Sequence, residues 1–210
     1  PRCPLVLSRE GFKYLGIFVT SEQDRFYTRN LLPPLNRLKS DVAHWKTLPL
    51  SLLGRAALFK MMSLPRFLYI LQNTPYPINK RYFAAINGEV GRLLWEGGSP
   101  RISREKLTKS WYEGGIALPD IQYYYWAAQL TIVNKWAFEP DTEPSLHLDR
   151  QLLQPRGYLR ALYDHSYGGK LRGPTASTVT IWHQTLAKMG WKEKITLQTP
   201  LWETRALGVL

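Results

Sequence analysis

The spacing of apolar residues predicts a short β-hairpin followed by a mainly helical chain. Leu5–Leu7 and Phe12–Val19 are apolar, partly β-branched runs, and Ser8–Gly11 between them contains a glycine, so the pair predicts a hairpin. Gly16 interrupts the second run and predicts a bulge or a close approach of another backbone. After the hairpin, the apolar spacing changes to that of helices.

The first helical pattern lies between residues 21 and 45. Ser21–Asp24 resembles a capping box. Pro33 and Pro34 should kink or restart this helix, because proline lacks the N–H that a helix interior needs. One apolar stripe, with spacings of three and four, should face a core: Leu31, Leu35, Leu38, Val42 and Trp45.

Two more helices are expected before residue 97. Ser51 can cap a helix that runs to about Leu64 or Leu71, and its apolar residues lie almost all round, so we expect the most buried element here. Asn79–Glu96 predicts the next helix, which Gly97-Gly98 should end. Its inward residues should be Tyr82, Phe83, Ile86, Val90 and Leu93, and Trp95 should also join the core.

The helical periodicity breaks after residue 98. Gly114-Gly115 predicts a turn that feeds a short strand at Ile116–Pro119, and Asp120 can cap a helix over Ile121–Phe138. That helix carries four consecutive aromatics, Tyr123–Trp126, of which a helix can bury only about half. Some of them should therefore face solvent or a partner.

The signals weaken beyond residue 138. Glu139–Ser145 is acidic and contains proline, which predicts a linker. Other expected features are helices at Ser145–Leu153, Tyr158–Tyr163 and Thr178–Met189 and a turn at Gly168-Gly169. The predicted fold class is mainly α, with a hairpin over residues 1–21, a helical bundle over 22–96, and a mixed segment of short strands and further helices over 97–210.

Composition and charge narrow the possible partners. A chain of 210 residues with 44% hydrophobic and 13% aromatic residues can bury a core. The net charge is +12, and residues 1–110 hold 18 Lys/Arg against 7 Asp/Glu. This half therefore carries +11, which favours a polyanion such as nucleic acid, although a basic surface without a partner has the same composition.

The sequence predicts an intracellular protein, nuclear or cytoplasmic. Cys3 is the single cysteine, so neither a disulfide framework nor a cysteine-based zinc site is expected within the chain. No signal-peptide pattern is present, so secretion is not expected. The most apolar stretch, Leu50–Leu71, contains two arginines, a lysine and a proline, which argues against a membrane span.

We find no self-contained catalytic apparatus in the sequence. The acids of the first half form no adjacent Asp-Asp pair of the kind that holds metal ions for phosphoryl transfer. No phosphate-cradling Gly-rich loop and no nucleophile elbow is present. The histidines are scattered without metal-ligand spacing: His44, His147, His165 and His183.

A basic stretch runs from Lys46 to Lys109, with eleven basic residues and three acidic ones. Arg55 and Arg66 would share one stripe of a continuous helix, unless Pro65 interrupts it. Such a stretch can follow a phosphodiester backbone, with Gly54 allowing a close approach. The alternative is a set of solvated helix faces whose long side chains cover apolar surface.

Four stretches resemble, in order and spacing, the LINE-type (non-LTR) retrotransposon reverse transcriptases. They are Phe12–Ile17, then Trp45-Lys46 with Leu53–Arg55 and Lys60, then Leu64-Pro65 with Tyr69, and Gly114–Asp120 with Tyr123-Tyr124. Trp95 and Arg101-Ile102 also match, so the resemblance covers about residues 11–137.

The resemblance implies a thumb and post-thumb region that follows the last palm hairpin, the primer grip. The family's metal-binding aspartates are missing, so the chain should not be an enzyme by itself, and it should need no cofactor, the divalent metal belonging to the missing palm. Expected partners are an RNA–DNA hybrid, or an RNA template with a DNA primer, and that palm; no membrane is expected. The alternative is a degenerate remnant that acts as a helical protein-interaction module through Tyr123–Trp126 and the tail, or that has no selected activity.

Fourteen residues are the candidates for contact with nucleic acid, some from the resemblance and some from the basic stretch. They are Lys13, Gly16, Lys46, Gly54, Arg55, Lys60, Arg66, Lys80, Arg81, Arg92, Arg101, Arg104, Lys106 and Lys109. Replacing Arg55 and Lys60 should weaken binding without unfolding the chain, unless both residues are structural.

Overall fold

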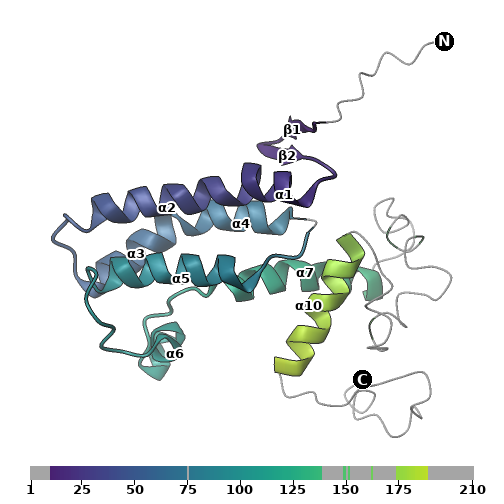
Figure 1. The fold of residues 1–210 in the computed structure, drawn as a ribbon. Coiled ribbons are helices and arrows are strands. Elements are labelled where there is room, and N and C mark those ends of the chain that lie inside the picture. The colour runs from purple at the N-terminus through teal and green to yellow at the C-terminus, as the bar shows by residue number, and fades with distance from the viewer. Residues whose placement is uncertain are drawn as a thin grey trace, which may run out of the picture. The chain divides into compact units, whose positions relative to one another are not determined.

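The computed structural model describes residues 10–74, 76–138, 149, 151, 162 and 174–188. The chain forms two compact units, one of residues 1–74 and 78–122 and the other of residues 75–77 and 123–210. The described residues are mainly helical and follow an N-terminal antiparallel hairpin, which confirms the predicted fold class (Figure 1).

The hairpin lies within the stretch that we expected to be a single strand. β1 (Phe12–Tyr14) pairs with β2 (Ile17–Val19), with Lys13 opposite Phe18. Leu15 and Gly16 form the two-residue turn, with φ of 45° and 86°. Positive φ at both positions is the type I′ geometry that matches strand twist. The predictions of one strand over Phe12–Val19 and of a bulge at Gly16 are therefore wrong, and Leu5–Leu7 lies outside the described residues.

A nearly continuous helical rod follows the hairpin. It consists of α1 (Gln23–Phe26), a π-helical turn (Tyr27–Leu31) and α2 (Leu32–Trp45). Both prolines lie in the first turn of α2, where a missing N–H is tolerated, and the chain stays helical from the π-helical turn into α2. All five residues of the predicted stripe are buried. The predicted capping box at residue 21 is wrong, because the helix starts after Glu22 and no side chain caps it.

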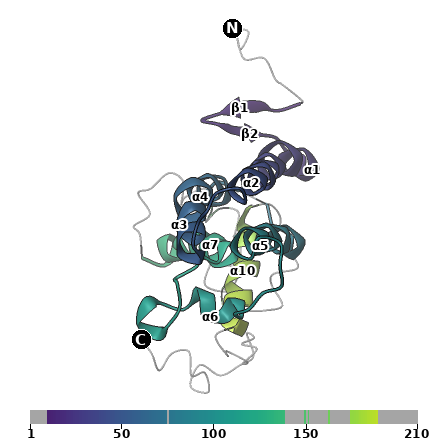
Figure 2. The same cartoon turned by 90° about the vertical axis from the view of Figure 1, so that its left-hand side faces the viewer.

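Three helices pack with the rod. Ser51 caps α3 (Leu52–Met62), α4 (Leu64–Gln72) starts after Ser63, and Asn79 caps α5 (Lys80–Leu94). α2 packs on α5, and α3 packs on α4 and α5 (Figures 1 and 2).

The prediction that the helix after Ser51 is the most buried element is wrong. Leu53, Met61 and Met62 of α3 are 47%, 73% and 44% exposed. α5 instead supplies the centre of this core, since all five of its predicted inward residues are at most 3% exposed. Trp95 at its end is half-buried.

A compact loop closes the first unit. It contains α6 (Arg104–Thr108) and a 3₁₀ turn (Trp111–Glu113). The N–H groups of Ile116 and Leu118 both donate to the Leu107 carbonyl, at 3.2 and 2.9 Å. These bonds hold residues 116–119 against α6, so the strand predicted there is wrong. A side chain at Gly115 would place its Cβ 2.0 Å from the Lys109 carbonyl oxygen, so only glycine fits.

The second unit contains most of α7 (Ile121–Phe138) and α10 (Pro174–Lys188). The bounds of α7 agree with the prediction, and Asp120 accepts the Gln122 N–H at 2.9 Å. α10 starts four residues before the predicted Thr178. The core of this unit is Val133, Trp136, Leu162 and Val179. The predicted linker, the turn at Gly168-Gly169 and nearly all of the two helices predicted between residues 145 and 163 lie outside the described residues.

Candidate nucleic-acid interface

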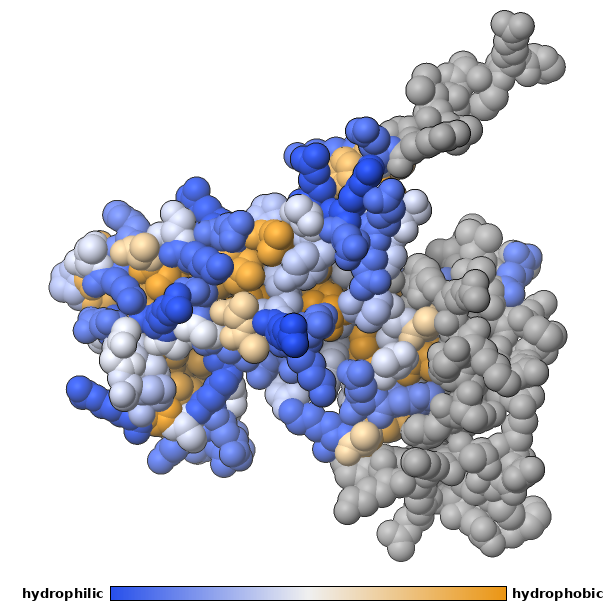
Figure 3. Space-filling view, viewed as in Figure 1, coloured by the Kyte–Doolittle hydropathy of each residue, from blue (hydrophilic) through white to orange (hydrophobic). Residues whose placement is uncertain are grey.

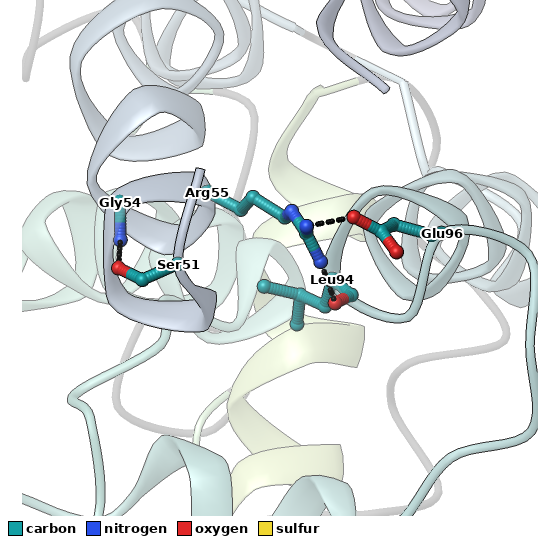
Figure 4. A network of polar contacts seen from close by, with 5 residues as sticks. All are labelled: Ser51, Gly54, Arg55, Leu94 and Glu96. Atoms are coloured by element: carbon teal, nitrogen blue, oxygen red, sulfur yellow. Dashed lines mark hydrogen bonds and ion pairs between the residues drawn. The ribbon is translucent and has the colours of Figure 1, made fainter. Parts of the chain in front are cut away.

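Arg55, one of the predicted contact residues, is held inside the fold. Its guanidinium donates to the Leu94 carbonyl at 3.0 Å and also pairs with Glu96 (Figure 4). The Arg55 side chain is only 13% exposed. Leu94 is the last residue of α5, where a helix leaves carbonyl groups without intrahelical donors. Arg55, in the first turn of α3, therefore supplies a hydrogen-bond donor to a carbonyl group at the C-terminal end of α5.

Four other predicted cations also have partners within the first unit. Lys60 donates to the Ile116 carbonyl at 3.0 Å, and Arg66 pairs with Asp41 at 2.7 Å. The remaining two pairs are Arg92 with Glu89, at 2.9 Å, and Arg104 with Asp120, at 4.0 Å. Burial lowers the pKa of Arg104, and the nearby Asp120 carboxylate opposes that shift.

These five side chains therefore each have a partner within the fold: Arg55, Lys60, Arg66, Arg92 and Arg104. Their contact with nucleic acid stays a prediction. α3 also ends at Met62, so the continuous stripe expected to carry Arg55 and Arg66 is divided between two helices.

Seven predicted cations form no ion pair within the described part of the chain. They are Lys13, Lys46, Lys80, Arg81, Arg101, Lys106 and Lys109. Lys46 is half-buried, and the other six are exposed. On the face drawn in Figure 3, hydrophilic residues surround the apolar patches of the helices and gather around the hairpin. Unpaired, exposed cations are the groups best able to neutralise phosphates.

Gly54 precedes Arg55 in α3, and its N–H donates to the Ser51 hydroxyl (Figure 4). A Cβ there would have its nearest neighbour, the Ser51 hydroxyl oxygen, at 3.5 Å, which is ordinary contact. A glycine inside a helix costs about 1 kcal/mol relative to alanine. Packing within the chain therefore does not explain the glycine, and the close approach of nucleic acid expected at Gly54 stays a prediction.

Two residues of the π-helical turn, Arg29 and Asn30, were not among the residues predicted from the sequence. The Asn30 side chain, in a residue only 4% exposed, accepts the Phe18 N–H at 2.8 Å and donates to the Phe18 carbonyl at 2.9 Å. The Arg29 guanidinium lies over the Phe18 ring, 5.6 Å from its centroid. Both contacts join positions more than ten residues apart, so no local spacing in the sequence indicates them.

A cavity of about 370 Å³ lies between the hairpin and the rod. Its lining includes Lys13, Gly16, Arg29 and Asn30, which brings two of the predicted contact residues together with the two that were missed. A second cavity, of about 390 Å³, is lined by Glu10, Asp24, Arg25 and Arg29 among others.

Neither a metal-binding cluster nor a membrane-spanning helix occurs among the described residues. In the part of the chain that is described, no three His, Cys, Asp or Glu side chains are grouped so that they could hold a metal ion. Over the same residues no helix is both long and apolar enough to cross a membrane. No protein-family model matches the chain. The resemblance to LINE-type reverse transcriptases stays a prediction.

Proposed function

We propose that this chain is the thumb and post-thumb part of a LINE-type RNA-directed DNA polymerase. In this account it grips the template–primer duplex, an RNA–DNA hybrid, through contacts with the phosphate backbone. It is not catalytic by itself: polymerisation and its divalent metal belong to a palm outside these residues. The proposed setting is the nucleus or the cytoplasm.

The observation that carries this proposal is the set of seven predicted cations that form no ion pair with any of the described residues. The first half of the chain has a charge of +11, and the ion pairs among its described residues do not include these seven side chains. They can therefore bind phosphates. Contacts with phosphates fix position without reading bases, as a polymerase needs for any template. The shape of a hybrid duplex, recognised through its backbone, suits such a surface.

The exposed apolar residues of the hairpin support the proposal that a palm packs against it. Phe12, Tyr14 and Leu15 are 56%, 62% and 74% exposed, and Val19 is 41% exposed. Phe12 and Val19 are cross-strand partners, so they share one face. An apolar face of this kind is expected where a palm packs against the hairpin.

Neutralising two unpaired cations tests the proposal. Lys80→Gln with Arg81→Gln removes two exposed charges at the start of α5. If both contact phosphates, the slope of log K against log salt for a hybrid duplex should fall by roughly 1.8, at about 0.9 per contact. The matched control is Arg25→Gln with Arg37→Gln, which removes two charges that already pair with Glu22 and Asp41. Equal effects of the two double variants would contradict specific backbone contacts.

One observation favours the alternative of a protein-interaction module. Tyr123 and Tyr124 are 45% and 44% exposed, whereas Tyr125 and Trp126 next to them are buried, so about half of the four aromatics are buried, as expected. Exposed neighbouring tyrosines are common at protein interfaces. A partner protein that stays bound after nuclease treatment and is lost with Tyr123→Ser and Tyr124→Ser would support this function over the grip.

A further inference from the structure

The cavity between the hairpin and the rod has the charge of an anion site. Among the described residues that line it are Lys13 and Arg29, and no carboxylate. Arg29 also lines the neighbouring cavity of about 390 Å³, which differs because Glu10 and Asp24 line it as well. Neither Lys13 nor Arg29 forms an ion pair within the described residues. Two cations that share one cavity without a carboxylate favour a negatively charged occupant.

The hairpin and the π-helical turn hold Arg29 in place at this cavity. The Phe18 ring lies under its guanidinium, and the main chain of Phe18 is fixed by two hydrogen bonds with the Asn30 side chain, one accepted and one donated by Asn30. A guanidinium that stacks on a ring keeps its in-plane N–H donors available for a phosphate. The extra residue of a π-helical turn is frequently found at functional sites. Here the π-helical turn places the Asn30 side chain against β2. The side chain of the preceding residue, Arg29, then lies at the cavity.

We propose that this cavity binds one phosphate group, with Arg29 and Lys13 as its two cationic ligands. The inference rests on the proposed function insofar as the phosphate belongs to the backbone of a bound hybrid duplex. The same chemistry would accept inorganic phosphate. Arg29 would supply a planar pair of N–H donors, and Lys13, the cross-strand partner of Phe18 on β1, would supply a point charge.

Single substitutions test this site against a matched neighbour. Arg29→Gln and Lys13→Gln should each weaken the binding of a hybrid duplex about tenfold, a loss typical of one charge-assisted hydrogen-bonding group. The double variant should lose less than the two single losses combined, because both residues hold the same phosphate. The matched control is Arg25→Gln. Arg25 lies one helical turn from Arg29 and pairs with Glu22 at 2.8 Å, so this substitution should change the affinity less than twofold.

An NMR measurement checks that each substitution leaves the hairpin docked on the helical rod. The side-chain amide resonances of Asn30 report the docked hairpin, and they should be the same in Arg29→Gln as in the unmodified chain. Arg29→Lys, which keeps the charge, should recover part of the affinity. Normal binding by Arg29→Gln, or an equal loss in Arg25→Gln, would overturn the inference.

Titration with inorganic phosphate separates this inference from the proposed function. Saturable shifts of the Gly16 and Asn30 amide signals in the unmodified chain, absent in Arg29→Gln, would support the phosphate site even if no hybrid duplex binds. If the hybrid binds with the expected salt dependence but neither phosphate nor the substitutions have an effect, the site is wrong and the proposed function stands.

Discussion

The side-chain amide of Asn30 hydrogen-bonds to both main-chain groups of Phe18, accepting from the N–H at 2.8 Å and donating to the carbonyl at 2.9 Å. It thus pairs with the outer edge of β2 as a third strand would. A two-stranded hairpin alone is marginal in water. This buried amide is therefore the main polar tie between the hairpin and the helical rod.

Asn30→Asp should destabilise the fold by about 2 kcal/mol at neutral pH. The change removes the donor to the Phe18 carbonyl and places a buried carboxylate beside that oxygen. Urea unfolding followed by circular dichroism measures the loss. Asn36→Asp, the same change at an exposed position of α2, should have an effect below about 0.5 kcal/mol.

The pH dependence of this variant gives a second check. Burial should raise the pKa of the introduced carboxyl above its unfolded value, so the deficit is present at neutral pH. It should shrink as the pH falls through that raised pKa, because the protonated carboxyl can again donate to Phe18. A deficit that grows relative to the unmodified chain on acidification would contradict this role of Asn30.

Arg55→Ala should cost about 2 kcal/mol of folding stability. The substitution leaves the Leu94 carbonyl, at the end of α5, without its donor at 3.0 Å. The pair with Glu96 adds little, because that carboxylate is 54% exposed. Chemical denaturation measures the change.

The control for Arg55 is Arg37→Ala, which removes an arginine with a 66% exposed side chain that pairs with Asp41. It should shift stability by less than about 0.5 kcal/mol. If Arg55→Ala were as stable as Arg37→Ala and bound a hybrid duplex more weakly, Arg55 would be a contact residue, as the family resemblance implies, and not a structural one.

The Ser110 and Glu113 pair predicts a local pH dependence. The Ser110 hydroxyl and N–H donate to the Glu113 carboxylate at 2.7 and 3.1 Å, and these bonds lower the pKa of Glu113. The stabilisation that they provide is therefore present above the unfolded pKa of this carboxyl and is lost as the pH falls through its lowered folded value.

NMR titration of the Glu113 carboxyl in Ser110→Ala tests this pair. The pKa of Glu113 should rise toward its ordinary value, because the hydroxyl donor is gone. Ser103→Ala removes another helix-capping serine, whose hydroxyl accepts the Lys106 N–H at 3.3 Å, and it should leave the pKa of Glu113 unchanged. An unchanged pKa in Ser110→Ala would show that the pair does not form in solution.

Local signals predicted much of the helical fold correctly. Ser51 and Asp120 cap the helices that they were expected to cap, and the apolar stripes of α2 and α5 are buried. The hairpin was misplaced because Leu15, a residue that rarely adopts positive φ, occupies its turn. Tertiary contacts decided that geometry: Asn30 binds β2, and the Tyr69 hydroxyl donates to the Leu15 carbonyl.

The candidate site was harder to predict than the fold. Sequence alone identifies Arg55 and Lys60 as cations, but their partners, Glu96 and Ile116, lie 41 and 56 residues further along the chain. Arg29 was missed for the related reason that its ring partner, Phe18, belongs to a different element. Whether a cation is paired or available depends on packing, which periodicity does not encode.

The salt dependence of hybrid-duplex binding by the unmodified chain tests the central claim most directly. Fluorescence anisotropy with two hybrids of unrelated sequence, between about 50 and 200 mM salt, gives log K against log salt. We predict similar affinities for both sequences and a straight line with a negative slope of several units. No binding, or an affinity that does not change with salt, would contradict it.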